Sequence, residues 1–195
     1  MKLQEPASAA PKQSWPVERI RHGAHAMMPL RFKGPLSRFG LAAALAFFVI
    51  DQAHKWWMLQ IYDITAKSPV KLAPILDLVL VWNRGISYGL FQQHSTLGRW
   101  ALIGFTVLVL AVLAVWLART HVRLPALALG LVIGGALSNL ADRLIHGAVA
   151  DFFHFHVYGF SWYVFNLADA VIVAGVAGLL YDSFHGRHKS ASNGL

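Results

Sequence analysis

The 195-residue sequence has no cysteine and few charged residues. Without cysteine, the chain cannot form a disulfide, a thiolate metal site or a cysteine nucleophile. Charged residues make up 13% of the chain and hydrophobic residues 56%, whereas an average soluble domain has roughly 25% charged residues. This composition is typical of a membrane protein. The net charge of +8 does not indicate nucleic-acid binding, because the cations lie in short segments beside apolar runs.

Four apolar segments are long enough to cross a bilayer core, which needs about 20 helical residues. They are Arg38–Gln60, Leu97–Ala118, Leu124–Leu144 and Trp162–Tyr181. The first resembles a secretory signal, but no small-residue cleavage site follows it, so we interpret it as a retained helix. The sequence therefore predicts an all-α membrane protein with four transmembrane helices in residues 36–186. Residues 1–35 are expected to form a disordered arm, and residues 187–195 a tail.

Lysine and arginine residues near the segment ends predict the orientation in the membrane. They occur in both terminal regions and between the second and third segments, whereas the connection Ile145–Ser161 has none. We therefore expect both termini and the connection between the second and third segments in the cytoplasm. The connection between the first two segments and Ile145–Ser161 are expected outside. The connection between the first two segments contains PILDLVLVWNRGISYGLF, which is rich in β-branched and aromatic residues. With Gly85 and Gly89 as turn points, it predicts a small extracytoplasmic sheet between these segments.

The tetrad Asn-Leu-Ala-Asp occurs twice, at Asn139–Asp142 and Asn166–Asp169. The first copy ends an outward-running helix and the second begins an inward-running one, so both are expected near the outer face. Asp151 lies in the connection between them, and three carboxylates can therefore meet at one depth. Ionisable groups within membrane segments are costly and indicate a functional site.

Each polar residue also has a structural interpretation. Asp142 has Arg143 beside it, which favours a structural ion pair. Asp51 and Lys55 lie four residues apart on one helical face, which favours a structural or substrate-positioning pair. Asn139 and Asn166 each precede an aspartate by three residues. Their amides can bond that carboxylate or a free backbone group, or simply join two helices.

Asp151 and Asp169 are the candidates for chemistry. If the fold brings them together, both carboxylates cannot ionise readily, so one keeps a proton while the other acts as a base. Such a pair can activate water against an amide carbonyl without a covalent intermediate. The same pattern is also typical of a proton or cation pathway.

Three histidines, His146, His154 and His156, raise the question of a metal site. No HExxH or comparable motif accompanies them, so we expect no metal and no cofactor. Interfacial histidines are the simpler interpretation. In the third apolar segment, Gly130, Gly134 and Gly135 indicate close helix packing.

Five motifs carry a resemblance to a known family. In order, they are DQAHK (Asp51–Lys55), NRGISYG (Asn83–Gly89), GGALSNLADR (Gly134–Arg143), VADFF (Val149–Phe153) and FNLADA (Phe165–Ala170). From about Phe39 to Tyr181 the chain resembles the lipoprotein signal peptidases (signal peptidase II), the bacterial intramembrane aspartyl peptidases. The pair Ser87-Tyr88 departs from the family, which usually has alanine and phenylalanine there, and the arm before Leu36 has no family counterpart.

The resemblance implies four transmembrane helices, an extracytoplasmic β-cradle and a catalytic dyad of Asp151 and Asp169 near the outer membrane face. It further implies a group of residues that line the pocket or support the dyad, with Asp142 in a structural pair with Arg143. This group is Asn83, Gly85, Asn139, Asp142, Arg143, Asn166, Asp51 and Lys55.

The implied substrate is a diacylglyceryl-modified prolipoprotein, cut just before its lipidated cysteine in the bacterial cytoplasmic (inner) membrane. Acyl chains would supply much of the binding energy, at about 0.8 kcal/mol per buried CH₂. We expect a monomer in contact with membrane lipid. The alternatives are a small transporter or channel subunit, for which carboxylates near the midplane would be expected, and a structural scaffold without chemistry.

Overall fold

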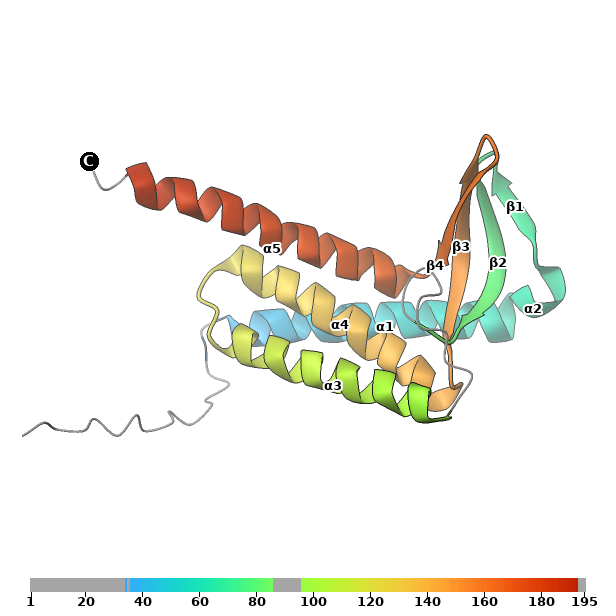
Figure 1. Ribbon diagram of the computed structural model, residues 1–195, viewed down its shortest axis with the longest axis horizontal. Helices are drawn as coiled ribbons and strands as arrows, with labels where there is room; N and C mark the ends of the chain where they lie inside the picture. The colour runs from blue at the N-terminus through green and yellow to red at the C-terminus, as the bar shows by residue number, and fades with distance from the viewer. Residues whose placement is uncertain (1–33, 35, 86–95, 193–195) are drawn as a thin grey trace, which may run out of the picture.

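The computed structural model describes residues 34, 36–85 and 96–192, so Ser87-Tyr88 and the N-terminal arm up to residue 33 lie outside the described residues. Four long helices lie side by side, and a small sheet covers one end of them (Figure 1). The long helices are α1 (Ser37–Trp56), α3 (Thr96–Ala118), α4 (Arg123–Ile145) and α5 (Leu167–Ser192). α1 continues as a π-helical turn, η1 (Trp57–Ile61), and the short helix α2 (Ile64–Lys67) follows.

Three helices in the described part of the chain are long and apolar enough to cross a membrane. They are α3, α4 and the stretch Leu167–His185 of α5. α1 has a suitable length, but its last turns contain the polar sequence DQAHK. The predicted boundaries agree with α3 and α4 to within one residue.

The predicted start of the last segment is wrong. Residues Trp162–Phe165 belong to a strand, and α5 begins only at Leu167. Two local features explain the difference. The sequence FSWYVF favours a strand because it is aromatic and β-branched, and Asn166 stops the strand because it caps the helix that follows.

The sheet has four antiparallel strands in the order β1-β2-β3-β4. β1 (Val70–Ala73) and β2 (Leu76–Asn83) come from the connection between α1 and α3, as predicted. β3 (Val149–Val157) and β4 (Phe160–Phe165) come from the connection between α4 and α5. The prediction of a sheet in the first connection alone is therefore incomplete, because β2 pairs with a distant strand, from Leu76 opposite Phe155 to Asn83 opposite Val149.

A tight turn joins β3 to β4. Tyr158 and Gly159 both have positive φ angles, 46° and 81°, as two-residue hairpin turns require. The hairpin returns the chain directly to the start of α5, with only Asn166 between β4 and the helix. This short path brings Asp151 of β3 close to Asp169 in the first turn of α5.

α4 is the central helix and packs closely against α1 and α5. A Cβ added to Gly134 would lie 2.5 Å from the Ala44 carbonyl oxygen of α1, and one added to Gly135 would lie 2.6 Å from the Ala168 carbonyl oxygen of α5. Gly130 likewise faces Gly40 of α1. The predicted close packing at these three glycines is confirmed. It allows polar residues of the three helices to meet at the end covered by the sheet.

A second apolar core fixes the sheet to the end of α1. It contains Met58 of η1, Ile64 of α2, Leu78 of β2, and Ala150 and Phe152 of β3. All five side chains are buried. Since Ala150 and Phe152 flank Asp151, this core also holds the backbone of Asp151 in place.

Candidate active site

Asp151 lies within a buried stretch of β3 and is 1% exposed. Its two carboxylate oxygens accept hydrogen bonds from side-chain amides: Asn166 Nδ2 at 2.6 Å and Asn83 Nδ2 at 3.1 Å. Burial, together with the negative charge of Asp169, raises the pKa of Asp151 to about 7, against the opposing effect of the two amides and of Lys55. Asp151 can therefore hold or release a proton near neutral pH.

Asp169 is the third residue of α5 and forms a reciprocal cap with Asn166. The backbone N–H of Asp169 donates to Asn166 Oδ1 at 3.0 Å, and the backbone N–H of Asn166 donates to Asp169 Oδ2 at 3.2 Å. This is the geometry of a capping box. The other oxygen, Asp169 Oδ1, accepts from Asn139 Nδ2 at 2.9 Å.

The two asparagines of the repeated tetrads connect these aspartates. Asn166 Nδ2 donates to Asp151 and also to Asn139 Oδ1 at 3.2 Å. Of the alternatives left open for these amides, Asn166 bonds a backbone group, because its Oδ1 accepts from the N–H of Asp169. Asn139 joins two helices, and it reaches across to Asp169 because α4 ends beside the first turn of α5.

The ammonium of Lys55 and the carboxylates of Asp51 and Asp142 form a buried group, which we call the Lys55 cluster. Lys55 Nζ lies 2.7 Å from Asp51 Oδ2 and 2.8 Å from Asp142 Oδ2. It also donates to Asn139 Oδ1 at 3.1 Å. The three residues are 1–3% exposed. The predicted pairing of Asp51 with Lys55 is confirmed, and all three ammonium protons have an acceptor.

The predicted pairing of Asp142 with Arg143 is wrong. Adjacent residues on a helix point about 100° apart, so Asp142 faces Lys55 of α1 while Arg143 faces the chain after β2. Arg143 donates to the carbonyl oxygen of Gly85 at 2.9 Å and to that of Asn139 at 3.2 Å. Asn83 Oδ1 accepts from the Gly85 N–H at 2.9 Å. Arg143 thus fixes the segment that carries Asn83.

The Lys55 cluster also binds the backbone beside each of the other two aspartates. Asp142 Oδ2 accepts from the N–H of Ala150, the residue before Asp151, at 3.2 Å. Asp51 Oδ1 accepts from the N–H of Ala168, the residue before Asp169, at 2.9 Å. Lys55 therefore joins two carboxylates, each of which positions one member of the pair Asp151 and Asp169.

Two residues that the sequence analysis did not select complete this cluster. Gln52 Nε2 donates to Asp142 Oδ1 at 2.8 Å and to Ser138 Oγ at 2.9 Å. The Ser138 hydroxyl donates to Asp51 Oδ2 at 2.6 Å. Ser138 precedes Asp142 by four residues, and this helical spacing could have indicated it. Gln52 lies inside the DQAHK motif, but no spacing rule distinguishes it.

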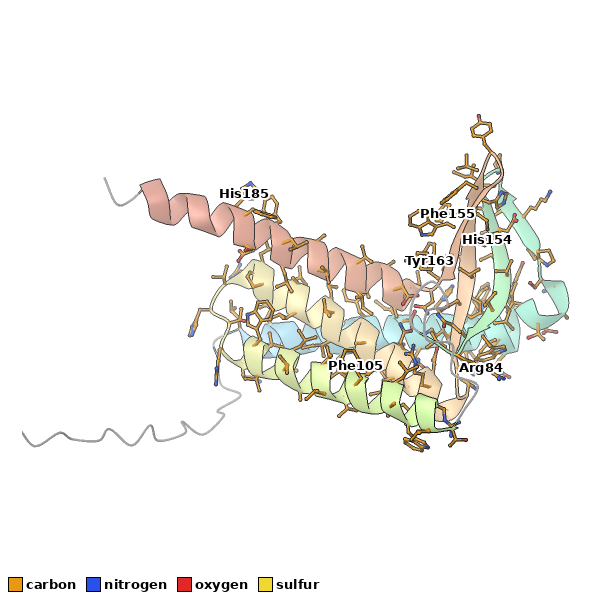
Figure 2. All side chains as sticks on the ribbon, in the orientation of Figure 1. Arg84, Phe105, His154, Phe155, Tyr163 and His185 are labelled. Atoms are coloured by element: carbon orange, nitrogen blue, oxygen red, sulfur yellow. The ribbon has the colours of Figure 1, made fainter. Side chains whose placement is uncertain are left out.

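Two cavities of different character meet at Asp169. The smaller one, about 170 Å³, is polar and is lined by Asn83, Thr106, Asn139 and Arg143 among others. The larger one, about 700 Å³, lies between the sheet and α5 and is mainly apolar. Phe155 and Tyr163 line it, and Figure 2 shows both on the side of the sheet that faces α5. A polar reacting group and an apolar chain could therefore be bound on two sides of one carboxylate.

The histidines lie apart from this network. His154 Nε2 is 2.6 Å from Ser161 Oγ, and His156 Nε2 is 3.0 Å from Asp77 Oδ2. The ring of His146 packs against Trp82 with a centroid distance of 5.2 Å. Among the described residues, no group of three histidine or acidic side chains is arranged to hold a metal ion.

Comparison with known proteins identifies similar sequences and folds. A family model described as signal peptidase (SPase) II matches residues 43–185. The chain is 58% identical over 144 residues to a lipoprotein signal peptidase of Methylobacterium sp. (strain 4-46), a match that covers 74% of this chain and 87% of the relative. It is 55% identical over 145 residues to a lipoprotein signal peptidase of Beijerinckia indica, covering 74% and 86%.

A solved structure described as a bacterial membrane enzyme has the same fold. It superposes with a TM-score of 0.65 at 22% sequence identity, covering 81% of this chain and 92% of the solved chain. At this identity the likeness concerns the arrangement of helices and sheet alone.

Proposed function

This chain belongs to the signal peptidase II family of bacterial membrane proteases, and on that premise we propose that it cleaves prolipoproteins by water activation between Asp151 and Asp169. The observation that carries the proposal is their shared network. Both carboxylates accept hydrogen bonds from Asn166, and each is otherwise bonded to an asparagine amide. Neither has a cation within ion-pair distance in the described part of the chain. Neutral partners leave both groups able to exchange protons.

We propose different roles for the two carboxylates. Asp169 lies at a helix N-terminus, where the helix dipole favours the anion, and acts as the base that takes a proton from water. Asp151, whose pKa is raised to about 7, acts in its protonated form and donates to the carbonyl oxygen of the scissile bond. The water oxygen then bonds to the carbonyl carbon. Collapse of this intermediate breaks the C–N bond, and a proton from the dyad goes to the departing amine.

The supporting residues have separable tasks in this proposal. Asn139 and Asn166 hold the two carboxylates, while Asn83 and Arg143 form part of the wall of the polar cavity near the scissile bond. Gly85 holds these two wall residues in place through its backbone. The Lys55 cluster holds the backbone next to Asp151 and next to Asp169 in position. This arrangement resembles other preorganised sites, where a misplacement of about 1 Å can reduce the rate about 10²-fold.

The proposed substrate carries a diacylglyceryl group on the cysteine that follows the cleavage site. The apolar cavity of about 700 Å³ beside Asp169 has the character needed for part of an acyl chain, which contributes about 0.8 kcal/mol per buried CH₂. Binding of the lipid would fix the depth of the scissile bond relative to the carboxylates.

We further propose that α1 crosses the membrane together with α3, α4 and α5. Asp51 and Lys55, the charged side chains of its last turns, are buried against α4 rather than turned toward lipid. With the termini in the cytoplasm, the sheet and both aspartates lie at the outer face of the inner membrane. One chain supplies every residue of the network, so a monomer suffices.

The proposal is tested by incubating the purified protein with one prolipoprotein in diacylglyceryl-modified and unmodified forms. Mass spectrometry of the products should locate the cut immediately before the modified cysteine, with little cleavage of the unmodified form. Cleavage elsewhere, or equal cleavage of both forms, would contradict the proposed specificity. The Asp151→Asn variant serves as the inactive control, and activity in that variant would contradict the dyad itself.

A further inference from the structure

A further hollow lies at the opposite end of the helix bundle from the sheet. It has a volume of about 410 Å³ and is formed by the end of α3, the connection to α4, the first turn of α4 and the part of α5 from Leu179 to Ser183. Figure 1 shows the α3–α4 connection at the end far from the sheet, and Figure 2 places His185, three residues after Asp182, near that end of α5. The hollow is therefore remote from Asp151 and Asp169, and nothing in the proposed reaction uses it.

The hollow is lined by one cationic and one anionic side chain, Arg119 and Asp182. Among the side chains that the structure describes, in residues 36–85 and 96–185, neither has a hydrogen-bond or ion-pair partner. The Thr120 hydroxyl in the same wall already donates to the Trp116 carbonyl oxygen at 2.9 Å, so it is less available to a ligand. Two unpaired opposite charges in one hollow are complementary to a zwitterion.

The surroundings of the hollow are those of a membrane interface. Trp116 and Leu179 form apolar parts of its wall. Trp116, Tyr181 and Phe184 are about half exposed or more at this end of the bundle, at 49%, 56% and 66%. Aromatic residues near the ends of membrane helices are typical of the headgroup level. A ligand at this position can therefore contact both the charged pair and the bilayer.

We infer that this hollow binds a phospholipid with a zwitterionic, primary-amine headgroup of the phosphatidylethanolamine type. Arg119 binds the phosphate, since a guanidinium matches phosphate oxygens well. Asp182 accepts hydrogen bonds from the ammonium, and an acyl chain lies along Trp116 and Leu179. A choline headgroup has no N–H to donate, and a glycerol headgroup has no cation, so neither satisfies Asp182 as well.

The inference is tested on the full chain in detergent by native mass spectrometry with dioleoyl lipids of three headgroups. We expect the first phosphatidylethanolamine to bind about three- to fivefold more tightly than phosphatidylcholine or phosphatidylglycerol, as for one partly exposed ion pair. Asp182→Asn should abolish this preference. Arg119→Gln should weaken binding of all three lipids. Arg123→Gln, which changes an exposed arginine at the start of α4 that does not line the hollow, should change nothing.

Three results would overturn the inference. Equal affinity of the unaltered chain for the three lipids would remove the selectivity, and unaltered binding by both Arg119→Gln and Asp182→Asn would place the lipid elsewhere. Displacement of the lipid by glycerophosphoethanolamine at equal concentration would identify a soluble ligand instead. Each variant retains the buried core, and its cleavage of prolipoprotein should match that of the unaltered chain, so failure here is distinct from failure of the proposed reaction.

Discussion

Lys55→Met removes the one cation of the Lys55 cluster while keeping the length of the side chain. The ammonium is within 2.8 Å of both Asp51 and Asp142, so its removal leaves two buried carboxylates without a counter-charge. Breaking a buried ion pair by removing one partner costs about 3–5 kcal/mol. At about 2–4 °C per kcal/mol for a chain of this size, the melting temperature should fall by roughly 6–20 °C.

The same substitution should slow cleavage in the molecules that remain folded. Asp51 and Asp142 hold the N–H groups of Ala168 and Ala150, and repulsion between the carboxylates would shift the backbone next to Asp169 and Asp151. A displacement of about 1 Å can cost about 10²-fold in rate, so we expect a loss of about ten- to a hundredfold. The measurement is the cleavage rate per folded molecule, well below the melting temperature.

Two further variants make this prediction specific. Lys71→Met removes an exposed lysine of β1 and should shift neither melting nor rate. Combining Lys55→Met with Asp142→Asn removes one of the two uncompensated charges, so the double variant should melt higher than Lys55→Met alone. An unchanged melting temperature for Lys55→Met would refute the charge argument. A lower melting temperature with a normal rate per folded molecule would refute the positioning argument.

Four other predictions follow from the site and the packing. Asp151→Asn and Asp169→Asn should each abolish cleavage, and the double variant should be no worse, because residues that act as a unit are non-additive; a twofold effect in either single variant would contradict the dyad. Because the pKa of Asp151 is raised to about 7, the folded chain binds a proton that the unfolded chain releases near pH 4, so stability should fall as pH rises from about 4 to 7. Asp151→Asn should reduce this slope in thermal melts, and the cleavage rate of the unaltered chain should fall above about pH 7. Gly135→Ala should reduce cleavage because its Cβ would meet the Ala168 carbonyl oxygen at 2.6 Å, whereas Gly104→Ala, whose Cβ meets nothing within 4 Å, should be neutral or slightly stabilising. Tyr158→Cys, at a fully exposed turn in a chain without cysteine, should react with an impermeant thiol reagent added from outside; labelling only from the cytoplasmic side would reverse the proposed orientation.

The helices could be predicted because they depend on local patterns. Long apolar runs gave α3 and α4 to within one residue, and the repeated tetrads indicated which polar residues gather. The last helix was predicted too early because hydropathy does not distinguish a strand from a helix in an apolar run. The β-branched and aromatic character of Phe160–Phe165 and the capping residue Asn166 decide that boundary.

Contacts between residues of different helices and strands could not be predicted from their spacing in the sequence. The pairing of β2 with β3 depends on a register between strands about 70 residues apart, and no local signal specifies it. Asp142 has an adjacent arginine in sequence, yet it bonds Lys55 of α1. Asn139 likewise reaches Asp169 rather than Asp142. In both cases the close packing of α4 on its neighbours decides the partner, and sequence neighbours point elsewhere.

The ion-pair and hydrogen-bond partners of four aspartates near one end of the bundle explain why these aspartates can have two different roles. Asp51 and Asp142 contact a lysine ammonium and backbone N–H groups, so a fixed cation compensates their charge. Asp151 and Asp169 receive hydrogen bonds from asparagine amides and backbone, which orient a carboxylate without supplying a charge. A cation partner stabilises the ionised form strongly, whereas neutral donors oppose burial only in part. The first pair is therefore suited to hold the backbone, and the second pair to accept and donate the protons that amide hydrolysis requires.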